Sequence, residues 1–356
     1  MELSVIIPTY NNGGVLARTL DALLAQRCSP DLYEIVIVDD GSTDGTAEMV
    51  RRLHSPVPIR YVAQPNRGRA AARNLGARVA RGRILLFLDS DFFAAPDLLA
   101  AHVKHYPPAA RRIGIQGASR THPDTLITPF MQGREVRLEV SPGPPGRISL
   151  FRISTRNLSL LRAEFIDVGG FDEAFGGYGW EDIELAWRLY ARGVRFTYEP
   201  RALGDHYQVQ DLEGLREKMR QGGKAAVYFW WKHGRSWWLG LRLEVAPVLL
   251  PIKWLVYRTR LLTPLVRWLL PRAEARGWRS LVSECTNHLV WEAYYEGVFS
   301  VLAEGRSGRH AFRRHLGEGV EGARLATPHG GGLQEDQGPG PLGDRVEARR
   351  SPPEVR

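Results

Sequence analysis

The chain contains the stretch Ile84-Leu85-Leu86-Phe87-Leu88-Asp89-Ser90-Asp91, in which five apolar residues run directly into two carboxylates. The apolar run has the length and composition of a buried strand. Two carboxylates at a strand end can hold a divalent cation against a diphosphate. An Asp-x-Asp triplet also occurs by chance in solvated turns, so its interpretation depends on the rest of the chain.

Around this stretch, β-branched runs alternate with helical patterns, and this alternation predicts an α/β fold with a mostly parallel sheet and helices on both faces. In such sheets ligands bind beyond the carboxyl ends of the strands, where this chain has polar and acidic loops. The predicted strands are residues 4–7, 34–38, 60–62 and 84–88, the helices between them are 15–26, 46–53 and 70–80, and the loops are 9–12, 39–42 and 89–91.

Residues 94–145 predict a helix followed by loops rich in Pro and Gly, in which residues 142–146 form a mobile segment that could serve as a substrate lid. Regular structure is predicted again from residue 150. The predicted elements there are a strand at 156–160, a turn at 169–172, a helix at 181–193 and a strand at 195–198 that leads to His206.

The composition changes near residue 210. Eight of the ten tryptophans lie between Trp230 and Trp291, interleaved with basic residues along what we predict to be short, proline-broken apolar helices. This pattern is typical of the interface of an anionic membrane, and a helical cap on the first domain or a dimer face is the alternative. We therefore predict a first domain at 1–210, a helical region at 211–304 and, from its Gly, Pro and charged residues, a disordered tail at 305–356.

The overall composition is that of a globular protein, with 356 residues, 44% hydrophobic, and a formal net charge of +9. Its two cysteines, Cys28 and Cys285, match no zinc or redox spacing, so free thiols in a reducing compartment are expected. The first residues lack the basic region of a signal sequence, so export is not expected. No uncharged apolar run reaches the ~18 residues of a membrane-spanning helix.

Four segments in order, residues 5–11, 38–46, 88–91 and 179–185, give the chain a close resemblance to the family-2 inverting glycosyltransferases of the GT-A fold. Residues 169–193 also resemble the acceptor-side segment of galactosyltransferase-like enzymes. The resemblance extends over residues 3–207. It implies transfer of a hexose-type sugar from a nucleoside-diphosphate donor to an acceptor hydroxyl, with a glycan or lipid-linked cell-envelope acceptor, in the cytoplasm or peripherally on the inner face of the membrane.

The same resemblance implies a divalent metal cofactor, Mn²⁺ or Mg²⁺, contacted by Asp91, with Asp89 near the ribose of the donor. His206 corresponds by position to a histidine that completes the metal site in some relatives, although a single histidine after a strand is often structural. Phe92 stands where many relatives carry a further Asp, so a carboxylate-rich metal site is not expected.

For the nucleotide, the resemblance implies that Asp40 accepts a hydrogen bond from the imide N–H of uracil and that Asp39 holds either the loop or the base. Pro8 and Tyr10 of the first motif are assigned to the same nucleotide-sugar site. An Asx turn followed by a helix cap is the alternative for the segment that contains the two acids.

Basic residues at 66–74 lie at a predicted loop and helix start, where anions are favoured. Arg73 is the candidate for contact with the nucleotide. Arg67 and Arg69 are weaker candidates, for which a solvated surface position is the alternative.

Inverting transfer needs a base that takes the proton of the acceptor hydroxyl as that oxygen attacks. By resemblance Asp182 is this base and Glu181 orients the acceptor or the loop, while Trp180 offers a face on which a sugar can stack. We expect Asp182 to have a pKa near its ordinary value and so to be ionised at neutral pH. Capping of the helix start is the alternative for this acidic pair.

Two other classes of function stay open. A nucleotide-sugar-binding protein without transfer activity could use the same domain. A dinucleotide-dependent oxidoreductase is disfavoured because residues 8–14 lack the Gly-x-Gly-x-x-Gly pattern. Nucleic-acid binding would rest on net charge and the aromatic-basic region alone, and we do not expect it.

Overall fold

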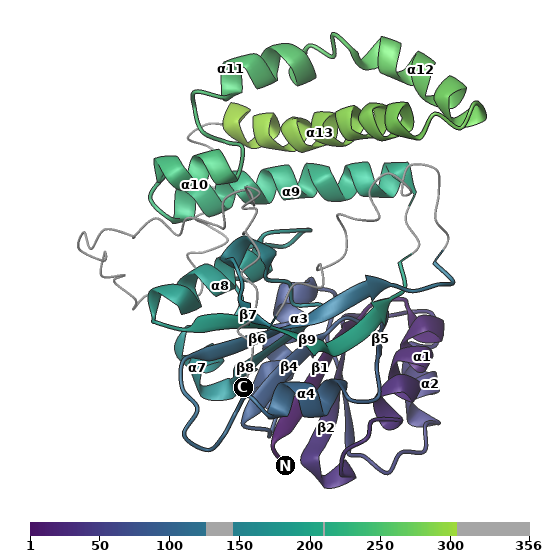
Figure 1. The fold of residues 1–356 in the computed structure, drawn as a ribbon, viewed down its shortest axis with the longest axis vertical. Helices are drawn as coiled ribbons and strands as arrows, with labels where there is room; N and C mark the ends of the chain where they lie inside the picture. Colours follow the sequence, from purple (N-terminus) through teal and green to yellow (C-terminus); the bar gives the residue numbers. More distant parts are fainter. Residues whose placement is uncertain (126–144, 209–210, 305–356) are drawn as a thin grey trace, which may run out of the picture. The chain divides into compact units, whose positions relative to one another are not determined.

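A computed structural model describes residues 1–125, 145–208 and 211–304. Within these ranges the strands form one nine-stranded sheet in the order β3-β2-β1-β4-β8-β6-β9-β5, with β7 paired to β9 (Figure 1). The strands are β1 (Leu3–Thr9), β2 (Tyr33–Asp39), β3 (Ile59–Ala63), β4 (Ile84–Leu88), β5 (Phe92–Ala94), β6 (Ile113–Thr121), β7 (Gly146–Arg147), β8 (Asn157–Leu161) and β9 (Arg195–His206).

Helices cover the sheet and continue beyond it. The first set is α1 (Gly13–Leu24), α2 (Thr46–Arg51), α3 (Arg69–Val79), α4 (Leu98–Val103), α7 (Arg162–Asp167) and α8 (Glu181–Ala191). The C-terminal set is α9 (Leu212–Lys232), α10 (Trp237–Arg242), α11 (Leu250–Lys253), the π-helical turn η3 (Trp254–Arg258), α12 (Thr263–Ala275) and α13 (Arg279–Ala303).

The first half of the sheet is parallel, as predicted. β1 pairs in parallel with β2 and with β4, and β2 pairs in parallel with β3. Every residue of β2 and β4 is buried, which explains the apolar runs at residues 35–38 and 84–88. Successive side chains of β1 enter different cores: Val5 and Ile7 pack with α1, whereas Ile6 packs with α3 and α8. The predicted α/β class is confirmed.

The second half of the sheet is mixed. β8 runs antiparallel to both β4 and β6, while β6 and β9 are parallel. The prediction of loops within residues 94–145 is wrong for residues 113–121, which form strand β6. Its glycines are needed because neighbouring side chains pack against the backbone there. A Cβ on Gly114 would lie 2.7 Å from the ring of Phe196, and one on Gly117 would lie 2.2 Å from the amide of Asn157.

The C-terminal helices differ in length from the prediction. Short apolar helices are confirmed for α10 to α12, but α9 and α13 have 21 and 25 residues. α13 packs against both α9 and α12 and lies between them in Figure 1. The backbones of α9 and α13 approach so closely that a Cβ on Gly223 would lie 2.0 Å from the Tyr294 carbonyl oxygen, and one on Gly297 2.0 Å from that of Arg220.

A third core joins these helices to the first domain. Phe175, Trp180 and Ile183, around the start of α8, pack with Phe229 of α9 and Tyr295 of α13. No helix in the described ranges combines the length and apolar character needed to cross a bilayer. Residues 142–144 of the predicted lid and the predicted tail at 305–356 lie outside the described residues.

Candidate functional site

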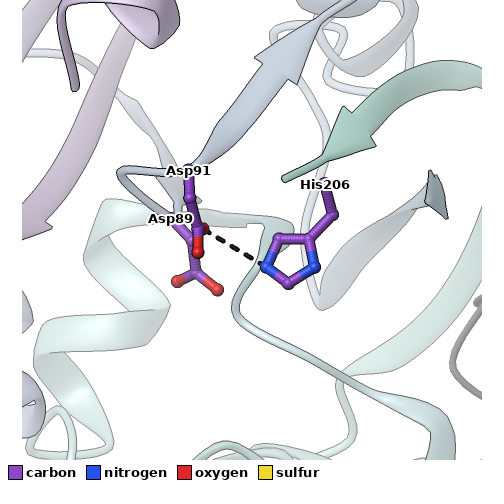
Figure 2. A group of neighbouring side chains, drawn as sticks. All are labelled: Asp89, Asp91 and His206. Atoms are coloured by element: carbon purple, nitrogen blue, oxygen red, sulfur yellow. Dashed lines mark ion pairs between the residues drawn. The ribbon is translucent and has the colours of Figure 1, made fainter. Parts of the chain in front are cut away.

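Three side chains at the end of β4 form a cluster that can hold a metal ion. Asp89, Asp91 and His206 each offer a ligand atom, and these atoms lie within 4.8 Å of one another (Figure 2). His206 Nε2 is 3.2 Å from Asp91 Oδ1. Carboxylate oxygens with one imidazole nitrogen suit Mn²⁺ and can also serve Mg²⁺, so the residues present fit the metal that the motif implies.

The register of two strands brings His206 to this cluster. β5 begins immediately after Asp91 and pairs antiparallel with β9, with Phe92 opposite His206. The N–H of Tyr207 donates to the carbonyl of Asp91 at 2.9 Å and continues the pairing. The ring of Phe92 is fully buried and lies where a Cβ on Gly204 would be, so this residue serves the core and not the metal cluster.

The turn that carries the carboxylates is fixed from α1. Thr19 Oγ1 donates to the carbonyl of Ser90 at 2.7 Å, and Asn12 Nδ2 donates to the Ser90 hydroxyl at 3.0 Å. Protein groups therefore hold the turn that sets the spacing of Asp89 and Asp91.

Arg73 links this cluster to the second acidic pair. Its Nη2 lies 2.9 Å from Asp89 Oδ1 and its Nη1 lies 3.3 Å from Glu181 Oε1. Its side chain is only 3% exposed, and that of Glu181 only 4%. Burial alone would raise the pKa of Asp89, but the positive charges of Arg73 and Arg156 hold that pKa below its ordinary value.

Asp182 lies beside Glu181 in the first turn of α8. The residue before them, Trp180, has φ of 71°, a left-handed conformation that is uncommon for a bulky residue and that turns the chain into the helix. Asp182 Oδ1 accepts a hydrogen bond from the Ile183 N–H at 2.8 Å. Burial and the charge of Glu181 raise the pKa of Asp182 to about 7, although Arg73 opposes the shift. The expectation of an ordinary pKa is therefore wrong, because the sequence does not reveal burial or the Glu181 charge.

The segment before α8 is held by α9. The N–H of Tyr178 donates to Gln221 Oε1 at 2.8 Å, and Trp180 Nε1 donates to the carbonyl of Gly222 at 2.9 Å. These bonds fix the loop that leads into the acidic pair.

The far end of α9 is tied to the same helix α8. Lys232 Nζ lies 2.7 Å from the buried Glu184 and 2.6 Å from Asp172. Burial would raise the pKa of Glu184, but the hydrogen bond from His233 and the charges of Arg188 and Lys232 lower it. Helix α9 thus supports the segment around the acidic pair from its middle, at Gln221 and Gly222, and from its C-terminal end, at Lys232.

The two acids at the end of β2 are buried and already make hydrogen bonds. Asp39 accepts from the Ser42 N–H at 2.7 Å and from the Tyr61 hydroxyl. Asp40 Oδ1 accepts from Gln64 Nε2 at 2.7 Å and from the Arg67 N–H at 2.9 Å, while Oδ2 accepts from the Gly68 N–H at 2.8 Å. Both acids hold loops, and Asp40 Oδ2 keeps a lone pair for a further donor.

The other residues predicted for the nucleotide site lie in different surroundings, some exposed and some within the sheet. Tyr10 follows β1 and is 52% exposed, whereas Pro8 is part of the strand. Arg67 pairs with Glu173 at 2.9 Å on the surface, and Arg69 lies 3.9 Å from Glu181. The structure thus brings Asp89, Asp91, His206, Arg73 and Glu181 together through direct contacts, and Asp182 follows Glu181 in the chain.

Two segments of the chain match known protein families. Residues 4–122 match the family described as Glycosyl transferase family 2, and residues 151–211 match the family described as the N-terminal domain of galactosyltransferase. These two matches fall on the segments whose motifs predicted the resemblance, and they confirm that resemblance to family 2 glycosyltransferases and to a galactosyltransferase-type segment.

Among curated relatives, the validoxylamine A glucosyltransferase of Streptomyces hygroscopicus subsp. limoneus is 38% identical over 233 residues, covering 57% of this chain and 51% of that protein. The chondroitin synthase of Escherichia coli is 31% identical over 256 residues, covering 62% of this chain and 37% of that protein. The chain thus matches about half or less of the length of these relatives.

Among solved structures, the mannosyltransferase PcManGT from Pyrobaculum calidifontis, in complex with GDP-Man and Mn²⁺, has a TM-score of 0.53 at 21% identity. The match covers 83% of this chain and 86% of that one. The predicted GT-A fold is confirmed.

Proposed function

We propose that this protein is a metal-dependent inverting glycosyltransferase that moves a hexose-type sugar from a nucleoside-diphosphate donor to an acceptor hydroxyl. The observation that carries the proposal is the buried Arg73, which contacts both Asp89 of the metal-type cluster and Glu181 of the acidic pair. Arg73 thereby joins the cluster that would hold the metal to the acidic pair that contains the candidate base, Asp182.

On the donor side, Asp91 and His206 would hold the cation and Asp89 would lie near the ribose. A bound Mn²⁺ or Mg²⁺ supplies Lewis-acid stabilisation of the charge that develops on the departing diphosphate. Arg73 sets the position of Asp89 and keeps it ionised. The free lone pair of Asp40 Oδ2 suits the imide N–H of uracil, with Asp39 fixing the loop.

On the acceptor side, Asp182 takes the proton from the attacking hydroxyl. A base with a pKa of about 7 is ionised in a large part of the molecules at neutral pH, and it binds the proton more strongly than an ordinary Asp. Glu181, fixed by Arg73, orients the loop. The ring of Trp180 is partly buried, and its accessible part is the proposed stacking surface for a sugar.

The acceptor is proposed to be a glycan or a lipid-linked cell-envelope molecule. The validoxylamine A glucosyltransferase among the relatives is named for the transfer of a glucosyl unit, which supports a hexosyl donor. We place the protein in the cytoplasm or peripherally on the inner face of the membrane.

The peripheral site is proposed to be the surface of α10 to α12. Of the fifteen large hydrophobic side chains that are exposed among the described residues, twelve lie between Trp237 and Trp278, and each is 38–68% exposed. Residues 235–279 contain nine Lys or Arg against two Glu. Exposed aromatic rings with a surplus of basic residues favour an anionic bilayer over a neutral partner.

Sedimentation with vesicles tests this surface. The double variant Trp254→Ser/Trp268→Ser should lose binding to vesicles that contain phosphatidylglycerol, while Ile166→Ser, which changes an exposed apolar residue on α7, should keep it. Equal binding by both variants would refute membrane docking. A dimer that the double variant abolishes would instead assign the surface to a second copy of the chain.

Thermal stabilisation by a panel of nucleotide sugars, with and without Mn²⁺, tests the donor. Product from the stabilising donor should have the anomeric configuration opposite to the donor, as judged by NMR. Asp182→Asn should lose transfer and keep donor binding. A protein that binds the donor but makes no product with any acceptor would fit the alternative, a nucleotide-sugar-binding protein.

A further inference from the structure

Lys218 of α9 lies next to the candidate site. Its Nζ is 5.5 Å from the centre of the Tyr178 ring, and the guanidinium of Arg69 is 4.8 Å from the same centre. Tyr178 is fixed to α9 by its hydrogen bond to Gln221, one turn after Lys218. An ammonium group from the C-terminal helices is thus held beside the segment that leads into Asp182.

Lys218 differs from the other basic residues of α9. It is partly buried, yet it forms no ion pair with any residue in the described ranges. The other partly buried basic residues of this helix each contact a carboxylate: Arg216 with Glu213 and Glu292, Arg220 with Glu217 and Glu296, and Lys232 with Asp172 and Glu184. Only the exposed Lys224 shares the lack of a described ion pair, which makes it a matched control.

Lys218 is influenced by the charges of the metal-type cluster and of two arginines. Burial and the charge of Arg69 lower the pKa of Lys218, whereas the charges of Asp91 and Asp89 act to raise it. Arg156 adds a third positive charge. Its backbone carbonyl accepts the Asp89 N–H at 3.4 Å, and its buried Nε has no hydrogen-bond partner in the described part of the chain. Lys218, Arg69 and Arg156 are thus close enough to influence one another and the two carboxylates of the metal-type cluster, and of the three only Arg69 has a carboxylate partner among the described residues, Glu181 at 3.9 Å.

We infer that Lys218, together with Arg69 and Arg156, binds the diphosphate of the donor, so that helix α9 forms part of the donor site. This inference rests on the proposed function. A diphosphate carries enough negative charge to satisfy the cluster's cation and the surrounding basic groups at once, whereas a nucleobase or a sugar hydroxyl does not. The C-terminal helices then have a role in donor binding besides supporting α8.

Calorimetric titration of the full chain with UDP, GDP, uridine and guanosine, in the presence of Mn²⁺, tests the inference. Lys218→Met keeps the length of the side chain and removes its charge, and Lys224→Met removes an exposed charge from the same helix. We expect Lys218→Met to weaken binding of the favoured nucleoside diphosphate about tenfold or more, with binding of the nucleoside unchanged. Lys218→Arg should restore most of the loss, and Lys224→Met should behave as the unaltered protein.

Two results would overturn the inference: diphosphate binding by Lys218→Met within twofold of the unaltered protein, or an equal loss in Lys224→Met. If Lys218→Met does not fold, as judged by its melting curve, Lys218→Gln is measured against the same thresholds. Absence of a nucleoside-diphosphate site, on which the proposed function depends, gives a different result, since the unaltered protein would then bind neither UDP nor GDP. Loss of affinity for an anionic acceptor alone would assign Lys218 to the acceptor and refute its donor role.

Discussion

Replacing Asp182 with Asn removes the ionisable group whose pKa the protein raises from 3.8 to about 7. The shape of the side chain and the acceptor for the Ile183 N–H are kept. A shift of about three pKa units, at about 1.4 kcal/mol per unit, corresponds to roughly 4 kcal/mol against the ionised form. Because solvent reaches part of the side chain, we expect Asp182→Asn to be more stable than the unaltered protein by about 2–4 kcal/mol at pH 8.

The sign of the pH dependence follows from linkage. The folded pKa lies above the unfolded one, so the contribution of Asp182 to stability is fully present below pH 3.8 and is lost as the pH rises through 7. The gain in free energy of unfolding should therefore be near zero at pH 4 and grow toward pH 8. Groups that titrate in this window without interacting with Asp182 are common to both proteins and cancel in the difference.

Urea unfolding at pH 4.5, 6 and 8 measures this difference directly. In parallel, transfer activity of the unaltered protein should rise about tenfold per pH unit below 7, and Asp182→Asn should lose about 10²–10⁴-fold in kcat. A difference in the free energy of unfolding that stays constant between pH 4.5 and 8 would show that the pKa of Asp182 is not raised, even if Asp182→Asn loses activity.

Three further outcomes are expected. His206→Gln should weaken Mn²⁺ binding about tenfold or more, measured as a loss of Mn²⁺-dependent thermal stabilisation, and unchanged stabilisation would remove the imidazole from the metal cluster. Gly297→Ala should lower the free energy of unfolding by about 1–3 kcal/mol or more, because the added Cβ meets the Arg220 carbonyl, and an unchanged urea midpoint would contradict this contact. Burial lowers the pKa of His102 from 6.5 to about 4, so the contribution of the neutral imidazole to stability is present above pH 6.5 and is lost as the pH falls through 4. The free energy of unfolding of His102→Gln should therefore depend less on pH between pH 4 and 6.5. Parallel plots of that free energy against pH for the two proteins would refute this.

Local patterns predicted much of the first domain. The strands and helices up to Asp91 were predicted to within a few residues, because each apolar run and each helical face is continuous in the chain. β6 was missed because Gly114 and Gly117 are packing positions that resemble loop residues in the sequence. The lengths of α9 and α13 were missed because their buried faces depend on each other.

The site, too, was predicted only in part. Asp89, Asp91, Asp182 and His206 belong to motifs with a characteristic order and spacing, so they could be named from the sequence. The bridge from Arg73 to Asp89 and Glu181, the support from α9, and the raised pKa of Asp182 arise from contacts between distant parts of the chain. A single sequence carries no signal for such contacts.

The pairing of β5 with β9 also determines which atom completes the metal cluster. The imidazole of His206 occupies the position opposite Phe92, with Asp205 before it and Tyr207 after it. Inserting one residue ahead of Asp205 would place a carboxylate in that position, and deleting one would place a phenol there. The preference of this protein among divalent cations could therefore change through a single gain or loss of length in β9, with no ligand residue substituted.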